Sequence, residues 1–240
     1  TKQVEILRPG VVANVSPELR PPLTAIRGYA ETLRQSPPDD PADAQHFLSI
    51  IENHAERLSR LTEDLLTLSD LESGKIELDF NAVDIGRVVQ SVLEVFSDTA
   101  NKKQVTLEQV IEPELPAVMG DVDRLQQLVI NLVDNAVKYT PVSGTVTVKA
   151  QRALINGICA VEVSVADTGV GIPEQANPRL TERFYRVDKA RSRDLGGTGL
   201  GLAIVKHIAQ AHGAQLKIES ALHKGTIVSV LLPTGGLPSP

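Results

Sequence analysis

The chain has 240 residues, of which 24 are basic and 30 acidic, giving a formal net charge of −6 at pH 7. This balance excludes the basic footprint of a protein that binds nucleic acid. With 42% hydrophobic and 22% charged residues, the composition is that of a folded globular protein. The single cysteine, Cys159, offers neither a disulfide nor a thiolate metal site, so we expect a reducing compartment and a buried, small apolar role for it.

Two long helices are predicted in the first seventy residues. Apolar positions recur at alternating steps of four and three over 47–68, with His54 as the one exception, and the same alternation runs over 12–33. Turn-forming residues at 36–41 separate the two stripes, which predicts a helical hairpin. Two helices alone cannot cover both stripes, so we expect two copies to form a four-helix bundle. We interpret His54 as a residue of that core or dimer interface.

The rest of the chain predicts a mixed α+β domain. Helical periodicity marks 85–98, 121–139 and 198–212. Strands are predicted at 75–80, 105–110, 145–151, 158–166, 215–220 and 226–232. This order favours one sheet layered on helices over a parallel doubly wound fold. The fold class that we expect is therefore α+β, an N-terminal antiparallel helical hairpin followed by an α/β sandwich.

Three segments of this domain carry chemistry. Asn131, Asn135 and Lys138 share one helical face, where amide oxygens suit Mg²⁺ and an ammonium suits phosphate. Taken alone, this face is more simply a solvated polar stripe. Asp167 ends a strand and is followed by a glycine-containing turn, where a carboxylate can accept a hydrogen bond from an exocyclic amine. A glycine-rich stretch at 196–202 opens a helix whose free N–H groups attract phosphate.

These segments resemble the conserved boxes of sensor histidine kinases, closest to the phosphate-sensing type. The matching stretches are N-L-V-D-N-A-V-K-Y at 131–139, D-T-G-V-G-I at 167–172, E-R-F-Y-R-V-D at 182–188 and G-G-T-G-L-G-L-A-I-V-K-H at 196–207. In addition, V-A-N-V-S-P-E-L-R-P-P-L-T-A-I at 12–26 resembles the family's dimerisation and phosphoacceptor box, V-A-N-V-S-H-E-L-R-T-P-L-T-A-I. The resemblance implies a dimerisation hairpin at 1–73, a Bergerat-type ATP-binding domain at 74–236 and a loose tail at 237–240.

The resemblance also implies roles for single residues. Asn135, supported by Asn131, would bind Mg²⁺, Lys138 would contact phosphate, and Asp167 would accept a hydrogen bond from the adenine amine. Tyr139 and the glycine segments would line the ATP pocket, with Gly169, Gly171, Gly197, Thr198, Gly199, Leu200 and Gly201 as the residues concerned. Arg186 and the segment up to Leu195 would form a lid. In the related gyrase and heat-shock ATPases a water-activating glutamate stands at the position of Asn131, so phosphoryl transfer is favoured here over hydrolysis.

The phosphoacceptor box departs from the family at its central position. The phosphorylated histidine falls at Pro17, which has no side-chain nitrogen, while Glu18, the base beside it, is present. Pro21 occupies the position where the family has Thr or Asn to orient water for phosphatase action. Extra prolines inside a helix remove hydrogen bonds, so we expect a break or fraying between about Val15 and Leu23.

Two functions therefore stay open. In the first, the chain is the catalytic core of a two-component kinase whose parent form phosphorylates a histidine and then a response-regulator aspartate. In the second, it is an ATP-binding dimeric pseudokinase scaffold that docks a response regulator without phosphotransfer. No apolar run reaches the roughly 20 residues that cross a bilayer, and the sequence starts at Thr1 without a signal pattern. We thus expect a cytoplasmic fragment whose parent is anchored to the membrane through segments outside this chain.

Overall fold

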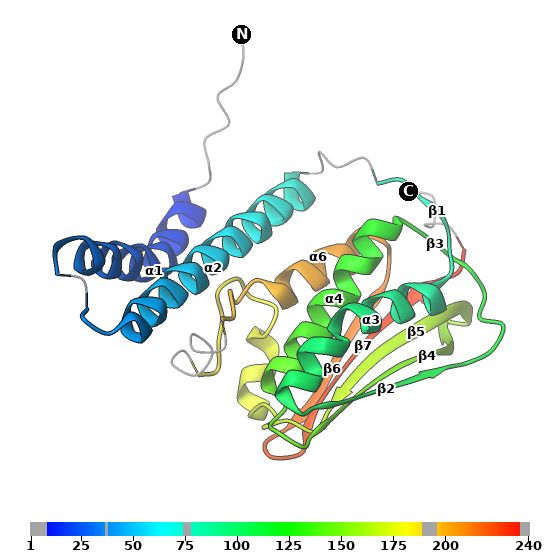
Figure 1. Ribbon diagram of the computed structural model, residues 1–240. Coiled ribbons are helices and arrows are strands. Elements are labelled where there is room, and N and C mark those ends of the chain that lie inside the picture. The colour runs from blue at the N-terminus through cyan, green and yellow to red at the C-terminus, as the bar shows by residue number, and fades with distance from the viewer. Residues whose placement is uncertain (1–8, 37, 74–77, 189–195, 236–240) are drawn as a thin grey trace, which may run out of the picture. The chain divides into compact units, whose positions relative to one another are not determined.

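A computed structural model of the chain describes residues 9–36, 38–73, 78–188 and 196–235 (Figure 1). The chain divides into two compact units, Thr1–Leu65 and Leu66–Pro240, and each is described by itself. Among the described residues, no helix combines the length and the apolar character that spanning a membrane requires. The tail predicted at 237–240 lies outside the described residues.

The first unit contains the predicted hairpin. Helix α1 (Pro9–Gln35) is followed by α2 (Pro41–Ser73), whose first turn is capped by the Asp40 carboxylate, which accepts a hydrogen bond from the Ala42 N–H at 2.8 Å. The rings of Tyr29 and Phe47 pack with centroids 5.1 Å apart, and Glu18 lies 3.8 Å from Arg57. The later residue on α1, Tyr29, thus contacts the earlier residue on α2, Phe47. The two helices are therefore antiparallel, as predicted.

The prediction of a break in the first helix was wrong. Helix α1 is continuous although it contains Pro17, Pro21 and Pro22. The fixed φ of proline, near −65°, is a helical value, so each ring costs a hydrogen bond without forcing an extended backbone. Pro17 and Pro21 lie on an exposed face, where water can bind the carbonyl groups that their missing N–H groups leave without a partner.

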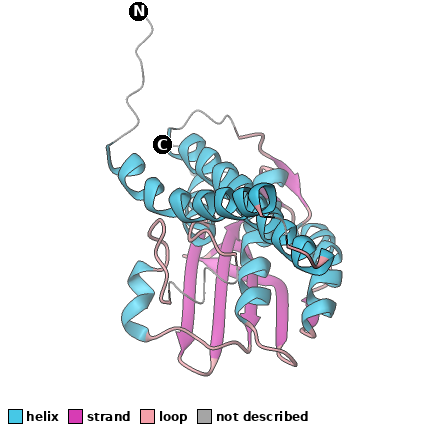
Figure 2. Cartoon of the chain, turned by 60° about the vertical axis from the view of Figure 1, so that its left-hand side comes forward, coloured by secondary structure: helices cyan, strands magenta, loops and turns pink. Residues whose placement is uncertain are grey.

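The second unit is built on a five-stranded mixed sheet, whose strands are magenta in Figure 2. Their order in the sheet is β2-β4-β5-β7-β6. Its strands are β2 (Thr106–Ile111), β4 (Thr145–Ile155), β5 (Ile158–Asp167), β6 (Gln215–Ala221) and β7 (Gly225–Pro233). The β2–β4 pair is parallel and the other pairs are antiparallel. A separate two-stranded ribbon pairs β1 (Asn81–Val83) with β3 (Val118–Gly120). The expected α+β class and layered sheet are confirmed.

Three helices lie on one face of this sheet, namely α3 (Ile85–Lys103), α4 (Val122–Tyr139) and α6 (Gly201–Ala211) (Figure 1). Their apolar stripes are buried against the valines of the strands, which form the core of the unit. Its fully buried members include Val89, Val92, Leu128, Val133, Val146, Val148, Val163, Ile204, Ile208 and Val230. A short 3₁₀ helix, η1 (Glu174–Arg179), lies in the long connection before α6.

Some details differ from the sequence prediction. Residues 78–80 are not part of a strand, residues 75–77 lie outside the described part, and β1 and β3 were not predicted. Helix α3 extends five residues beyond the predicted end, and α6 begins at Gly201 instead of Thr198. The prediction that Cys159 is buried was also wrong, since it is exposed. Cys159 pairs with Leu154 beside the Asn156–Gly157 turn, at the end of the β4–β5 hairpin, where Leu154 is exposed too.

Candidate nucleotide-binding site

Helix α4 presents the predicted polar face. The Asp121 carboxylate caps its start by accepting hydrogen bonds from the N–H groups of Asp123 and Arg124, both at 3.1 Å. The apolar stripe of the helix is buried against the sheet. Asn131, Asn135 and Lys138 therefore lie along the other side, and all three are partly buried.

The two asparagines lie against the start of α6. The Asn131 side-chain amide donates to the Gln127 carbonyl at 2.9 Å, so its Oδ1 is directed away from that carbonyl. A Cβ atom at Gly201 would lie 2.9 Å from Asn131 Oδ1 and 3.5 Å from Asn135 Nδ2. The structure thus brings together the asparagine helix and the glycine segment, and only a glycine fits at position 201 without displacing Asn131.

Lys138 makes an ion pair that was not predicted. Its ammonium nitrogen lies 2.5 Å from Asp134 Oδ2, one helical turn earlier. The spacing of these two residues could have indicated this pair, because side chains four apart on a helix are neighbours. A phosphate that binds Lys138 must therefore share the ammonium with Asp134 or replace this carboxylate.

Asp167 ends β5 in a partly buried position. Burial raises the pKa of its carboxyl group, while hydrogen bonds from the backbone N–H groups of Gly169 and Thr226 act in the opposite direction. The bond from Gly169 measures 2.8 Å to Oδ1. A carboxylate that is fixed in this way, and has acceptor capacity left, can receive a hydrogen bond from an amine of a ligand.

The turn after Asp167 is fitted closely to its neighbours. A Cβ atom at Gly169 would lie 2.7 Å from the Tyr139 carbonyl oxygen at the end of α4, and one at Gly171, where φ is +66°, would overlap the Ala221 carbonyl group. The structure therefore places Tyr139 beside the turn that holds Asp167.

The second glycine segment is joined to the phenylalanine-containing segment. The Gly199 carbonyl accepts a hydrogen bond from the Phe184 N–H at 2.8 Å, and the Gly197 carbonyl accepts one from the Arg186 guanidinium at 2.7 Å. The Thr198 hydroxyl oxygen accepts from the Leu200 N–H at 3.3 Å. Leu200 is fully buried, so only its backbone is available to a ligand. Residues 189–195 of the predicted lid lie outside the described residues.

The donor set fits magnesium that arrives with a polyphosphate. Within the described residues there is no group of three His, Cys, Asp or Glu side chains that could hold a metal ion. The amide oxygens of Asn131 and Asn135 are hard ligands of the kind that Mg²⁺ accepts, and Mg²⁺ is usually bound by one or two protein ligands together with substrate phosphates. The residues present are therefore compatible with Mg²⁺ bound as part of a nucleotide complex.

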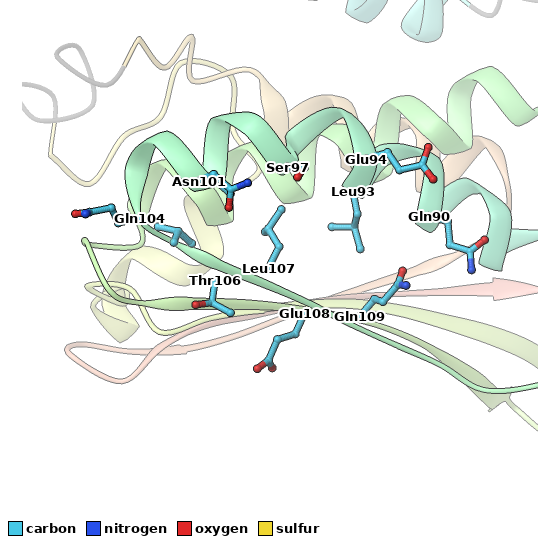
Figure 3. Close-up of a pocket in the computed structure, with 12 residues that line it drawn as sticks. Gln90, Leu93, Glu94, Ser97, Asn101, Gln104, Thr106, Leu107, Glu108 and Gln109 are labelled. Atoms are coloured by element: carbon cyan, nitrogen blue, oxygen red, sulfur yellow. The ribbon is translucent and has the colours of Figure 1, made fainter.

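A separate hollow of about 890 Å³ lies between α3 and the edge strand β2. Figure 3 shows Leu93 and Leu107 between the helix and the strand, while Glu108 points away from the helix. None of the residues predicted to bind the nucleotide lines this hollow. It is therefore distinct from the site formed by α4, α6 and the Asp167 turn.

In the first unit, Pro17 is exposed and Glu18 is paired with Arg57 on the other helix. The side chains of Glu18 and Arg57 are only 15% and 14% exposed, respectively. The contribution of Arg57 could not be predicted, because the two residues are far apart in the sequence and no motif joins them.

Comparisons with known proteins identify both parts of the chain. Residues 10–74 match the His Kinase A (phospho-acceptor) domain, and residues 120–236 match the family of histidine kinase-, DNA gyrase B-, and HSP90-like ATPases. The sensor histidine kinase WalK of Bacillus subtilis is 38% identical over 226 residues, which are 92% of this chain and 36% of the relative. The chain thus spans about a third of the length of that relative.

Solved structures give the same result. The ShkA structure in complex with AMPPNP is 31% identical over 97% of this chain and 47% of its own, with a TM-score of 0.69. The complex of histidine kinase ThkA with the response regulator TrrA has a TM-score of 0.75 at 25% identity, covering 95% of this chain and 62% of the other. A mycobacterial sensor histidine kinase, MprB, is 31% identical, with a TM-score of 0.54, and 99% of its chain is covered by 66% of this one. The chain therefore belongs to the sensor histidine kinase family, with a phosphoacceptor-type helical domain followed by a kinase-type ATPase domain.

Proposed function

We propose that this chain is the cytoplasmic, dimeric core of a two-component sensor kinase that binds Mg·ATP. The observation that carries the proposal is the placement of Asn131 and Asn135 beside Gly201, so close that a Cβ atom there would lie 2.9 Å from Asn131 Oδ1. This placement joins a magnesium-type ligand set to a phosphate-type helix start. The AMPPNP bound to ShkA supports the assignment of the nucleotide. We assign residues 1–73 to the dimerisation hairpin, 74–236 to the ATP-binding domain and 237–240 to the tail. The resemblance of the sequence boxes favours a kinase of the phosphate-sensing type, and analogy with the family favours a membrane-anchored parent.

Each side of the site has one task in this proposal. Asn135, with Asn131, would hold Mg²⁺, which neutralises phosphate charge during phosphoryl transfer. Lys138 exchanges its contact with Asp134 for a phosphate oxygen, and the N–H groups at Gly199 and Gly201 bind phosphate at the start of α6. Asp167 accepts a hydrogen bond from the adenine amine beside Tyr139, with Gly169 and Gly171 shaping the turn. The hydrogen bond from Arg186, at the start of the predicted lid, to the Gly197 carbonyl would link the lid to the residues that bind phosphate.

Phosphoryl transfer needs an acceptor, and Pro17 cannot supply one. In the parent form a histidine at position 17, with Glu18 as the neighbouring base, would receive the phosphoryl group and pass it to a response-regulator aspartate. For the chain as it stands, Pro17 favours a second function, that of a nucleotide-binding dimeric scaffold which docks a response regulator without phosphotransfer. The complex of ThkA with its response regulator supports the same class of partner.

The test compares this chain with Pro17→His in γ-labelled ATP and Mg²⁺. We expect acid-labile label only on the histidine variant, at residue 17, and no label when Asn135→Ala is added to it. Label on the chain as given, mapped to another residue, would contradict the assignment of Pro17 as the lost acceptor. A folded chain that does not bind Mg·ATP would contradict the proposed function itself.

A further inference from the structure

Lys103 joins the end of one helix to the end of another. It is the last residue of α3, and its ammonium donates hydrogen bonds to the carbonyl oxygens of Val137 at 2.7 Å and Lys138 at 2.6 Å, in the last turn of α4. The backbone adds a second link, because the Ser143 N–H donates to the Gln104 carbonyl at 2.8 Å. The end of α3 is thus fixed to the end of α4 by a charged contact and to the loop after α4 by a neutral one.

These bonds supply partners to two carbonyl groups at the end of α4. The last four carbonyl groups of a helix lack ordinary helical partners. The Ala136 carbonyl still has its helical partner, the Thr140 N–H at 3.0 Å, and also accepts from the Thr140 hydroxyl at 2.7 Å. The next two carbonyls accept from Lys103, whose positive charge also interacts favourably with the negative end of the helix dipole. Without Lys103, the carbonyls of Val137 and Lys138 would lose a charged donor in a partly buried place.

The next carbonyl, that of Tyr139, faces Gly169 in the turn after Asp167. Gly169 packs so closely against it that a Cβ atom would lie 2.7 Å from the oxygen. The Gly169 N–H in turn holds Asp167 Oδ1. A displacement of the last turn of α4 would therefore move Gly169 and, through its N–H, the carboxylate of Asp167.

We propose that Lys103 is a positioning residue that sets the base selectivity of the nucleotide site. This inference rests on the proposed binding of Mg·ATP. Lys103 does not touch the base itself, and acts by holding the α4 end against which the Asp167 turn is packed. A carboxylate in place accepts a hydrogen bond from the amine of adenine and repels the carbonyl oxygen at the same position of guanine, so the preference for ATP over GTP reports where Asp167 lies.

The experiment measures the dissociation constants of Mg·ATP and Mg·GTP by calorimetry for the full chain and three variants. For Lys103→Met we expect ATP to bind about tenfold more weakly while GTP changes little, so the ATP/GTP preference falls by about the same factor. Lys103→Arg keeps a charged donor and is expected to restore most of the preference. Lys102→Met, at the neighbouring exposed position of the same helix turn, is the matched control and should leave both constants unchanged.

The possible outcomes separate the two proposals. If the unmodified chain binds neither nucleotide, the proposed function fails. If it prefers ATP and a folded Lys103→Met keeps the same preference, or loses ATP and GTP affinity equally, the inference about Lys103 is wrong. If Lys103→Met does not fold, Lys103→Gln is measured in its place, and failure of both to fold would assign Lys103 to stability and overturn its positioning role.

Discussion

At the scale of single residues, the proposed site depends on side chains whose roles no neighbouring side chain could take over. Asn135 is the clearest case, because it is partly buried beside Asn131 and Gly201 and has no second amide that could replace it on the same helical turn. In the proposed Mg·ATP complex, removing its amide would leave the metal ion with one fewer protein ligand in a site that offers few.

We therefore expect Asn135→Ala to abolish measurable Mg·ATP binding, with a loss of at least about a hundredfold, comparable to the larger effects at metal-binding positions. Calorimetric titration with Mg·ATP measures the loss. The control is Asn101→Ala, which removes an exposed amide from α3 beside the separate hollow. Unchanged binding in the Asn135 variant would refute the role given to that residue.

The hydrogen bonds of His212 define its protonation state. Its Nε2 accepts a hydrogen bond from the Asp121 N–H at 3.0 Å, so Nδ1, which lies 2.8 Å from the Ile208 carbonyl, carries the proton of a neutral ring. Burial lowers the pKa of His212, against the opposing effects of the Ile208 hydrogen bond and Asp121. The folded state thus binds a proton at His212 less readily than the unfolded state does.

This difference predicts a pH dependence of stability. Above the ordinary histidine pKa of about 6.5, His212 is neutral in both the folded and the unfolded state, so it does not make the free energy of unfolding depend on pH. As the pH falls below about 6.5, the unfolded state takes up the proton first, so the free energy of unfolding decreases. His212→Gln should lower stability by about 1–3 kcal/mol at pH 8 and flatten this decrease, as measured by urea denaturation between pH 5 and 8. His223→Asn, at an exposed position, is the control, and an equally steep decrease in the Gln variant would exclude His212 as its source.

At the scale of elements, replacing a glycine by alanine is expected to be favourable in α1 and unfavourable in α6. A Cβ atom at Gly28 in α1 would have no neighbour within 4 Å, whereas one at Gly201, the first residue of α6, would press on Asn131. Gly28→Ala should therefore stabilise the chain by about 0.5–1 kcal/mol through helix propensity alone. Gly201→Ala should weaken Mg·ATP binding instead. Thermal denaturation and calorimetry check the two effects, and a Gly201 variant with normal affinity would exclude the packing argument.

The elements also show what the sequence could predict. The helices α3, α4 and α6 and the five strands of the main sheet have long, regular patterns. The asparagine and glycine segments predicted to form the site lie together in the structure, with Asn131 and Asn135 beside Gly201. The ribbon of β1 and β3 was missed because a strand of three residues carries too little periodicity. The contacts of Lys103 with α4 and of Arg57 with Glu18 join distant segments, so no local pattern contains them. Cys159 is exposed beside the turn of the β4–β5 hairpin, where its partner Leu154 is exposed too, and alternation along the strand does not encode this.

At the scale of the whole molecule, the hairpin retains apolar surface of its own. Leu23 of α1 is 53% exposed and Leu48 of α2 is 50% exposed in the single chain. Exposed leucines on amphipathic helices are what a second copy would cover in a four-helix bundle.

We accordingly expect the chain to have twice its monomer mass of 25.8 kDa in solution. The double variant Leu23→Glu/Leu48→Glu should reduce the mass to that of the monomer, because charges would then have to be buried. Light scattering coupled to size exclusion measures both masses. Leu154→Glu, which changes a more exposed leucine of the β4–β5 hairpin, should remain dimeric. If the unsubstituted chain is a monomer, the proposed four-helix bundle is contradicted.

The order of strands in the sheet has a consequence for synthesis on the ribosome. The strand that ends at Asp167, β5, lies between β4 and β7, and β7 follows α6 and β6 along the chain. A nascent chain therefore emerges with β5 lacking one neighbour until β7 has left the exit tunnel. Under the proposed function, selectivity for adenine would thus be acquired only after β7 has been synthesised, and a ribosome stalled before β7 would display the asparagine helix without a completed base pocket.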